Sequence, residues 1–510
     1  MSSVRDITYG DELNNKIFQG VEKIYLVAKA AYGPKAGNAL IEATHGAPLL
    51  SRDGVTNVKK VFLTDAVEDM AAQVVKQASE KNNEKAGDGT SAVVILAYHL
   101  YKAARKLVSA GHNQMEVSRM IDEACTQVIA HIESIKRPVD GTLINDVATI
   151  SAGDEALGEL IAETIETVGV DGGVTVEDYP GIGIHNEIVD GFYFKRGFKD
   201  VRLINDYSGL RASYTNVAIF LVDNRISTVA EIAPIMETCI GNNIKQLVII
   251  GEVSDDALSV LILSKAKGVI DVTVVDPPVF GGGRTLFLED IAVLTGGKLL
   301  VSKPSDFDTK ALGYAEKVII TEHSTTIIGA DGADEDKEAR IKEIREQLAS
   351  EKNPNSLDFI RDRLAQLTGK IAVIRVGGST EIEQQEAKLR VQDAVCAVQS
   401  AISGGIVPGG GVTLANVHGT AFDDAFREPF RQLLDNGGFN PDTYLAKITP
   451  ESPWSGFNIR TLHDKTDAVD LLEEGIIDPA EVIIEVVRNA SSVVSRLITT
   501  SVALTIKKEE

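Results

Sequence analysis

Residues 84–91 read Glu84-Lys85-Ala86-Gly87-Asp88-Gly89-Thr90-Ser91, and an apolar run from Ala92 to Leu100 follows at once. Two glycines flank an acid and two hydroxyls come next, directly before a segment that favours a helix. Glycines allow backbone N–H groups to approach a ligand closely. The first turn of a helix adds unpaired N–H donors at the positive end of its dipole. This combination attracts phosphate.

Asp88 does not fit a site for bare phosphate, because like charges a few ångströms apart repel. A Mg²⁺ ion between the carboxylate and the phosphate resolves the conflict, since magnesium takes few protein carboxylates and completes its shell with phosphate oxygens and water. The stretch therefore predicts a magnesium–nucleotide site. A helix N-cap formed by Asp or Thr beside a turn glycine explains the same residues equally well.

The composition restricts the class of protein. A chain of 510 residues is too long for one compact core, and we expect roughly two to four domains. The net charge of −23 argues against nucleic acid and against an anionic membrane surface as partners. No apolar run reaches transmembrane length, and no basic segment followed by an apolar one opens the chain. Cys125, Cys239 and Cys396 lie far apart, which indicates neither disulfides nor a cysteine zinc site. We expect a soluble, cytoplasmic protein.

The hydrophobic pattern distinguishes the ends of the chain from its middle. Both ends carry Ala- and Val-rich helical segments with glycine loops, at 66–107 and at 480–506, where Asp478 before a proline suits an N-cap. In the middle, β-branched runs such as 218–222 and 246–250 alternate with helical segments, which is α/β patterning. We therefore expect a mixed α and α/β protein in which a domain built from both ends receives the others as insertions.

Three further features could belong to the nucleotide site. The stretch 32–38 breaks a helix and supplies backbone donors, although a helix C-cap followed by a turn also explains it. Asp53 is a second carboxylate beside a glycine. Asp393 lies late in a helix expected at 381–403, where it either pairs with Arg390 at i, i+3 or orients a water molecule.

The helical segment 257–263 is apolar on more than one face. A surface helix needs only one apolar face, so the second is either buried in a core or part of a binding groove. Burial is the commoner explanation, and the pattern alone leaves both open.

A series of short motifs runs along the chain in this order: Tyr32-Gly33-Pro34-Lys35, Arg52-Asp53-Gly54-Val55, Ala86-Gly87-Asp88-Gly89-Thr90, Thr149-Ile150-Ser151-Ala152, Arg196-Gly197, Gly409-Gly410-Gly411-Val412 and Gly475-Ile476-Ile477-Asp478-Pro479. Through these motifs and their order the chain resembles, over almost its whole length, the group I chaperonins, the ring-forming class of bacteria and organelles. The resemblance implies a three-domain, ring-forming subunit. The helical equatorial domain would comprise 1–134 and 404–510, the small intermediate domain 135–190 and 372–403, and the α/β apical domain 191–371.

The resemblance also implies cofactors and site residues. ATP and Mg²⁺ would be the cofactors, with K⁺ as a further candidate. The nucleotide would contact Ala31, Tyr32, Gly33, Pro34, Arg52, Asp88, Gly89, Thr90, Ser91, Ala92, Ile150, Gly410, Asn458 and Asp478, with Asp88 on the metal. Asp393 and Asp53 would be catalytic, Asp393 by positioning the attacking water. The apolar groove for substrate would consist of Phe198, Leu203, Ala233, Met236, Leu258, Ile262 and Leu263.

The function implied is that of an ATP-hydrolysing chaperonin. It would bind nonnative polypeptides in the apical groove and promote their folding in the cavity of a homo-oligomeric ring, expected to have seven subunits. Two alternatives stay open: a holdase ring with impaired hydrolysis, and a metabolic ATP-dependent enzyme such as a kinase. The retained Asp53, Asp88 and Asp393 argue against lost hydrolysis.

The chain also departs from the family pattern. Asp200 and Arg202 occupy groove positions where the family has a small and an aromatic residue, which reduces apolar area and makes docking of a co-chaperonin doubtful. Asn440 stands where an acid normally pairs with the arginine matched by Arg431, and the segment after Gly411 is shorter than usual. Because this region contributes to packing between stacked rings, one ring and two rings both stay open.

Overall fold

The computed structural model describes residues 5–42, 48–51, 54–139, 141–169, 173–207, 209–279, 281–301, 308–350, 354–462 and 467–506. The chain forms two compact units. The helical unit comprises residues 1–163 and 378–510, and the sheet unit comprises residues 164–377. An eight-stranded sheet is the centre of the second unit.

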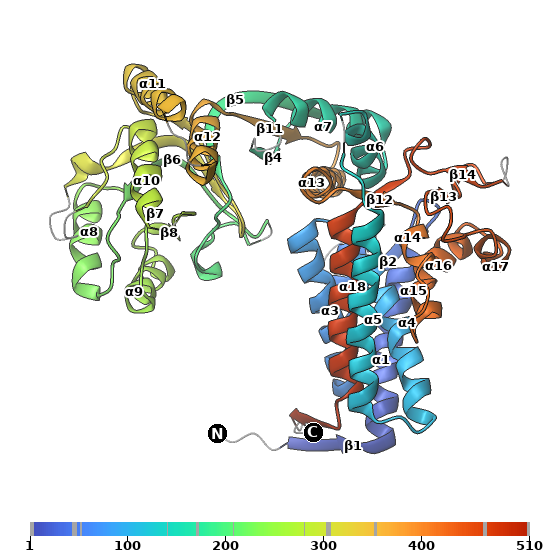
Figure 1. Cartoon of the computed structure of the whole chain (residues 1–510). Coiled ribbons are helices and arrows are strands. Elements are labelled where there is room, and N and C mark those ends of the chain that lie inside the picture. Colours follow the sequence, from blue (N-terminus) through green and yellow to red (C-terminus); the bar gives the residue numbers. More distant parts are fainter. Residues whose placement is uncertain are drawn as a thin grey trace. The chain divides into compact units, whose positions relative to one another are not determined.

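Helices make up most of the helical unit (Figure 1). They are α1 (Gly10–Ala30), α2 (Gly54–Lys59), α3 (Ala66–Ala86), α4 (Thr90–Ser109), α5 (Gln114–Ile135), α6 (Gly141–Ala152), α7 (Glu155–Val168, which runs into the sheet unit), α13 (Glu381–Gly404), α14 (Val412–Ala415), α15 (Asp423–Phe426), α16 (Glu428–Asn436), α17 (Pro441–Leu445) and α18 (Ala480–Ile498).

The long helices α1, α3, α4, α5 and α18 run side by side around the core of this unit (Figure 1). The four residues from Val93 to Leu96 of α4 are each 0% exposed, because a helix that is apolar on every face is stable only when other helices surround it. Gly20 allows α1 and α3 to approach closely, since a Cβ at that position would lie 2.1 Å from the carbonyl oxygen of Glu68.

The two ends of the chain meet in one small sheet. β1 (Arg5–Tyr9) pairs antiparallel with β16 (Val502–Ile506). The helix expected to continue to Ile506 is therefore wrong beyond Ile498. The hydroxyls of Thr499 and Thr500 bond back to backbone carbonyls one turn earlier, which weakens a helix end. The alternating apolar residues that follow have the period of a strand.

Three further two-stranded sheets complete the helical unit: β2 (Ala39–Ile41) with β3 (Leu49–Ser51), β12 (Ile406–Pro408) with β15 (Ile477–Pro479), and β13 (Ser455–Gly456) with β14 (Val469–Asp470). Asp478 lies in β15 opposite Val407. The N-cap of α18 is Pro479, with φ −61° and ψ 129°, so the expected N-cap at Asp478 is wrong. The aspartate is thereby left available for another role.

The sheet of the second unit has the order β4-β11-β5-β10-β9-β6-β7-β8. Its strands are β4 (Val174–Asp178), β5 (Ile184–Phe194), β6 (Ala212–Leu221), β7 (Gln246–Ile250), β8 (Asp271–Val275), β9 (Gly313–Ile320), β10 (Thr325–Ala330) and β11 (Lys370–Val376). The β6–β7, β7–β8 and β4–β11 pairs are parallel, and the others are antiparallel. Short 3₁₀ helices, η1 (Val201–Leu203) and η3 (Thr309–Ala311), lie in its connections.

Helices cover both faces of this sheet. On β7, Leu247 and Ile249 pack against α8 (Val229–Gly241) and α9 (Asp255–Ala266), whereas Val248 and Ile250 pack in the core that contains α10 (Gly282–Thr295). The alternation follows from the two-residue period of a strand. Two more helices, α11 (Asp334–Ser350) and α12 (Pro354–Thr368), lie beside α10 (Figure 1). The expected mixed α and α/β fold class is confirmed.

Candidate functional site

The turn between α3 and α4 has the features of an anion site. Gly87 and Gly89 both have left-handed backbone conformations, with φ of 75° and 84°, which glycine adopts without steric penalty. Gly89 is the N-cap of α4, and no side chain caps this helix. The alternative of an N-cap made by Asp or Thr is therefore not realised. The first-turn N–H groups of α4 have no partner within the helix and can bind an anion.

Buried asparagines hold this turn in place. Asn82 Nδ2 donates to the backbone oxygen of Asp88 at 2.6 Å, and Asn489 Nδ2 of α18 donates to Asn82 Oδ1 at 3.2 Å. The two asparagines are 0% and 5% exposed. Neither asparagine is among the site residues predicted from the sequence, although a polar amide within an apolar helix is a signal for such a role.

Carboxylates from three elements converge beside the turn. Burial, and then the charge of Asp88, raises the pKa of Asp478 to about 7. Burial, followed by the charges of Asp393 and Asp88, raises the pKa of the Cys396 thiol to about 12. Burial raises the pKa of Tyr32 as well, with Asp478 and Asp88 contributing. These five residues therefore lie within electrostatic reach of one another, and we call this group the acidic crevice.

Close packing fixes Asp393 near the turn. A Cβ at Gly87 would lie 2.0 Å from the Cβ of Cys396, so α13 touches the backbone of the turn at that point. Asp393 precedes Cys396 by three residues on the same helix and thus lies on the same face. Part of the Cys396 residue is exposed to solvent, although the atoms around its thiol are dense enough to raise the pKa of that group.

The loop after α1 forms another wall of the crevice. Asn436 Nδ2 donates to the backbone oxygens of Lys29 and Tyr32 at 2.7 and 2.8 Å and holds the loop against α16. Gly33 has φ 90°, and a Cβ there would lie 2.2 Å from Leu433 Cδ2. Only glycine fits this position, and the adjacent Pro34 has no N–H of its own.

Other predicted nucleotide contacts lie around β15. Gly409 and Gly410 directly follow β12. The backbone N–H of Gly409 donates to the backbone oxygen of Ile476, just before β15, at 2.9 Å. Asn458 Nδ2 donates to Glu474 Oε2 at 3.0 Å, and Ile150 lies on α6, which packs against β15.

The remaining predicted contacts divide into described and undescribed residues. Ala31 is the C-cap of α1, and Ala92 is buried in the core with 8% exposure. Arg52 and Asp53 lie outside the described residues. Gly54, which follows them, packs on the α4 turn, since a Cβ there would lie 2.3 Å from Ser91 Oγ.

The described side chains do not form a complete metal site by themselves. Within the described ranges, no group of three His, Cys, Asp or Glu side chains could hold a metal ion. A Mg²⁺ ion bound by Asp88 would thus take its other ligands from phosphate oxygens and water, as magnesium usually does.

The predicted substrate residues of the sheet unit differ in accessibility. Leu203 is 0% exposed, and Met236 and Leu258 are 6% exposed, because all three pack in the core beneath α8 and α9. Leu263 is 54% exposed. Burial in the core therefore explains Leu258, whereas the exposed Leu263 leaves the binding groove a prediction.

The other predicted groove residues lie between these extremes. Ala233 and Ile262 are partly buried, and Phe198 packs against the core of the opposite face. Val229 and Ile240, at the two ends of α8, are 48% and 47% exposed and are not among the residues predicted from the sequence. Exposed apolar residues at the ends of a helix are difficult to distinguish from core residues by spacing.

At two positions where the chain departs from the family pattern, the structure shows ion pairs within the chain. Arg202 forms a bidentate pair with Asp200, with distances of 2.8 and 2.6 Å, so both charges are satisfied locally. Arg431 pairs within the chain with Asp442, two residues after Asn440, at 3.0 Å.

Comparison with known proteins shows the family. The model of the TCP-1/cpn60 chaperonin family matches residues 24–420. The chain belongs to this family. The resemblance to group I chaperonins is confirmed, and the chain is a divergent member.

Solved chaperonin structures have the same fold. The chaperonin gp146 from the bacteriophage EL 2 (Pseudomonas aeruginosa), crystallised in the presence of ATP-BeFx, matches with a TM-score of 0.71 and 21% identity over 98% of this chain and 99% of that chain. A second crystal form of that protein matches with a TM-score of 0.63 and 20% identity over 99% of both chains. This chaperonin therefore has the three-domain chaperonin architecture. None of its described helices is long and apolar enough to span a membrane.

Proposed function

We propose that this chaperonin binds and hydrolyses ATP in the acidic crevice and uses that cycle to fold nonnative polypeptides. One observation carries the proposal: the uncapped N-terminus of α4 opens beside Asp88, Asp393 and Asp478. Backbone donors attract phosphate, whereas three carboxylates require a cation. A magnesium–nucleotide complex satisfies both demands.

The residues around the crevice suit the parts of this ligand. The backbone of Gly89 and Thr90 and the hydroxyl of Ser91 would hold the phosphates, and Asp88 would hold Mg²⁺, which neutralises phosphate charge. Gly33, Pro34, Ile150, Gly410, Asn458 and Asp478 would surround the rest of the nucleotide. The phage chaperonin was crystallised with ATP-BeFx, which supports nucleotide binding in this fold. K⁺ stays a further candidate.

Asp393 would position the attacking water. Its carboxylate lies on the wall of the crevice and interacts electrostatically with the Cys396 thiol, as Asp88 does. A carboxylate so placed can accept a hydrogen bond from water and orient it toward a phosphate. Asp53 would be the second catalytic residue. It directly precedes Gly54 in the chain, and Gly54 packs against Ser91.

The sheet unit would bind nonnative polypeptides on the face of α8 and α9. Val229, Ile240 and Leu263 offer apolar surface there, and burial of apolar surface stabilises a complex by about 25 cal/mol per Å². Of the predicted residues, the partly buried Ala233 and Ile262 would line the groove with them. Leu203, Met236 and Leu258 would support it from the core beneath, and Phe198 packs against the other face of the sheet. A co-chaperonin stays doubtful, since the Asp200–Arg202 pair adds charge at this site.

We also propose assembly into a homo-oligomeric ring of seven subunits in the cytoplasm. Ile7 and Leu504 of the β1–β16 sheet are 63% and 52% exposed, and Leu40 and Leu50 of the β2–β3 sheet are 72% and 62% exposed. Two-stranded sheets leave unpaired edges and are marginally stable alone. Pairing between the sheets of neighbouring copies would satisfy these edges and cover the leucines. The equatorial, intermediate and apical boundaries predicted from the sequence remain part of this proposal.

The first test is the native mass of the purified protein with and without Mg-ATP, measured by light scattering. At 54.7 kDa per chain, a monomer, a seven-membered ring and a double ring differ clearly. A ring supports the proposal. A stable monomer or dimer under both conditions would overturn the ring and its folding cavity.

The second test measures ATP turnover of Asp393→Asn against Glu386→Gln, an exposed carboxylate on the same helix. We expect loss of about two orders of magnitude for Asp393→Asn, the range of general base catalysis, and little change for the control. Equal turnover would remove Asp393 from its role. If the wild type binds unfolded chains in a ring but does not hydrolyse ATP, the holdase alternative replaces the proposal.

A further inference from the structure

A second candidate site lies in the sheet unit, and half of its lining residues are basic. A cavity of about 230 Å³ is bordered by Arg196, Lys199, Arg225 and Arg284 and by two acids, Glu252 and Asp276. We call it the basic pocket. An accumulation of positive charge is unexpected in a chain of net charge −23, because random placement would surround it with acids.

Both acids of the pocket are already paired. Asp276 Oδ1 lies 2.7 Å from Lys199 Nζ. Glu252 Oε1 lies 3.2 Å from Arg284 Nη1, and Asp223 Oδ1 accepts from Arg284 Nε at 2.6 Å.

Two arginines of the pocket are not paired with these acids. In the described part of the chain, Arg196 and Arg225 have neither an ion pair nor a side-chain hydrogen bond. Two guanidinium groups that share a cavity repel each other. An anion between them would remove the repulsion and use their planar fork of donors.

The N-terminus of α10 lies between two residues of the chain that line the same cavity. Val279 and Arg284 both line it, and the start of α10 lies between them in the chain, at Gly281 to Gly283. Gly281 is the N-cap, no side chain caps the helix, and its first turn contains no acid. The free N–H groups of this turn and the positive end of the helix dipole therefore add to the attraction for an anion.

Neighbouring contacts hold this turn in position. Thr285 Oγ1 donates to Asp223 Oδ2 at 2.6 Å, and the same aspartate binds Arg284. A Cβ at Gly283 would lie 2.8 Å from Val279 Cγ1, so the backbone passes too close to Val279 for a side chain. The donors are thus ordered before any ligand binds, which favours affinity.

We propose that the basic pocket binds an oxyanion, either a free phosphate group or the carboxylate of an acidic peptide. Both ligands offer oxygen acceptors to guanidinium and backbone N–H donors. This proposal does not depend on ATP hydrolysis, because every residue of the pocket lies in the sheet unit and none belongs to the acidic crevice.

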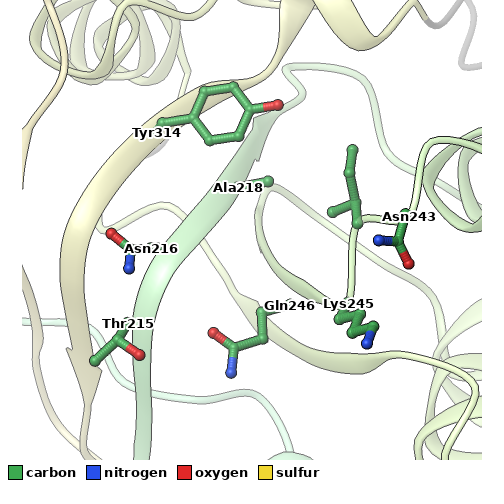
Figure 2. Close-up of a pocket in the computed structure, with 8 residues that line it drawn as sticks. Thr215, Asn216, Ala218, Asn243, Lys245, Gln246 and Tyr314 are labelled. Carbon is green, nitrogen blue, oxygen red and sulfur yellow. The ribbon is translucent and has the colours of Figure 1, made fainter.

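A second cavity of the same unit supplies the control. It has a volume of about 400 Å³ and is lined by Thr215, Asn216, Asn243, Gln246 and Tyr314, with Lys245 as its charged residue (Figure 2). Lys245→Gln removes one positive charge from the same unit, as Arg225→Gln does, but leaves the basic pocket intact.

The test is hydrogen–deuterium exchange of the full-length protein, read on the peptide that covers residues 281–287. This local readout separates the basic pocket from phosphate bound at the acidic crevice. Sodium phosphate and an acetylated, amidated tetraglutamate peptide are titrated separately, with sodium chloride added to keep the ionic strength constant. At about ten times the dissociation constant, exchange should slow roughly tenfold, as mass action requires.

Protection should be lost in Arg196→Gln and Arg225→Gln and kept in Lys245→Gln. Both arginines are exposed, so their replacement should not impair folding, and unchanged exchange elsewhere in the sheet unit checks this. Protection by phosphate alone identifies a free oxyanion, and protection by the peptide alone identifies a polypeptide carboxylate. No protection by either probe, or equal protection in all three variants, would overturn the proposal.

Discussion

Asp478→Asn should stabilise the nucleotide-free protein at pH 8 and leave its stability almost unchanged near pH 4. Burial and the neighbouring Asp88 raise the pKa of Asp478 from 3.8 to about 7. Below pH 3.8 the carboxyl is neutral in both the folded and the unfolded chain. As the pH rises toward 7, the unfolded chain loses the proton first, so the folded protein loses stability over this interval.

The magnitude follows from the size of the shift. A difference of roughly three pKa units, at about 1.36 kcal/mol each, sets an upper limit of about 4 kcal/mol above pH 7. Asp478 keeps partial exposure, and solvent screening reduces such energies. We therefore expect about 2 kcal/mol of stabilisation at pH 8. Asparagine keeps the volume of the side chain and cannot ionise.

Urea denaturation followed by tryptophan fluorescence measures the stability of the helical unit, which contains Asp478. Trp454 is the single tryptophan of the chain and is 8% exposed within the helical unit. The midpoint difference between variant and wild type should grow from pH 4 to pH 7 and then become constant. Glu473→Gln, an exposed carboxylate of the same segment, should show no such growth.

Two results would refute the reasoning. Equal midpoints of wild type and Asp478→Asn at pH 8 would show that the carboxylate ionises without penalty. A difference of the same size at every pH would show that packing, and not charge, causes the change.

Three other substitutions test separate parts of the structure. Gly87→Ala should strongly reduce ATP turnover, measured by phosphate release, because its Cβ would overlap Cys396; adding Cys396→Gly should restore part of it, whereas adding Cys396→Ala should not. Asp290→Asn should lower the thermal stability of the sheet unit by about 3–5 kcal/mol, measured by circular dichroism, since it leaves the buried Arg363 without a charged partner; an unchanged melting curve would contradict this. Leu504→Ser should lower the mass found by light scattering, and an intact ring would exclude the β1–β16 sheet as the ring contact.

Local patterns were sufficient for much of the fold. The alternation of strands and helices around β6 to β8 follows from β-branched runs separated by helical segments. The sequence of residues 84–91 predicted the turn before α4 as a nucleotide site, because glycines, an acid and hydroxyls occur together at the start of a helix. Such features depend only on residues close in sequence.

Features that depend on distant residues were not visible. The sequence pattern predicts a helix through the residues of β16. Val502, Leu504 and Ile506 form a strand only because β1 pairs with them, and β1 lies at the other end of the chain. The same holds for Asp290, whose burial at 1% exposure is explained by Arg363 and Arg340. Long-range pairing is not encoded in any local period.

The groove residues show a different limit. Leu258 and Leu263 belong to one apolar helix, yet the first is 6% exposed and the second 54% exposed. Sequence spacing identifies apolar residues on a helix, but the exposure of each depends on which face the sheet covers. Only the packing of α9 on β7 and β8 decides between them.

The electrostatics of the acidic crevice explain why its structural supports are polar and buried. Asp88, Asp393 and Asp478 come from a turn, a helix and a strand, and their mutual repulsion tends to drive these elements apart. Asn82 and Asn489 bind the turn to α18, and the Gly87–Cys396 contact brings α13 onto it. These contacts hold the carboxylates together before a cation binds. Burial, and then the charge of Asp88, raises the pKa of Asp478, and the proposed Mg²⁺ ion would offset that negative charge.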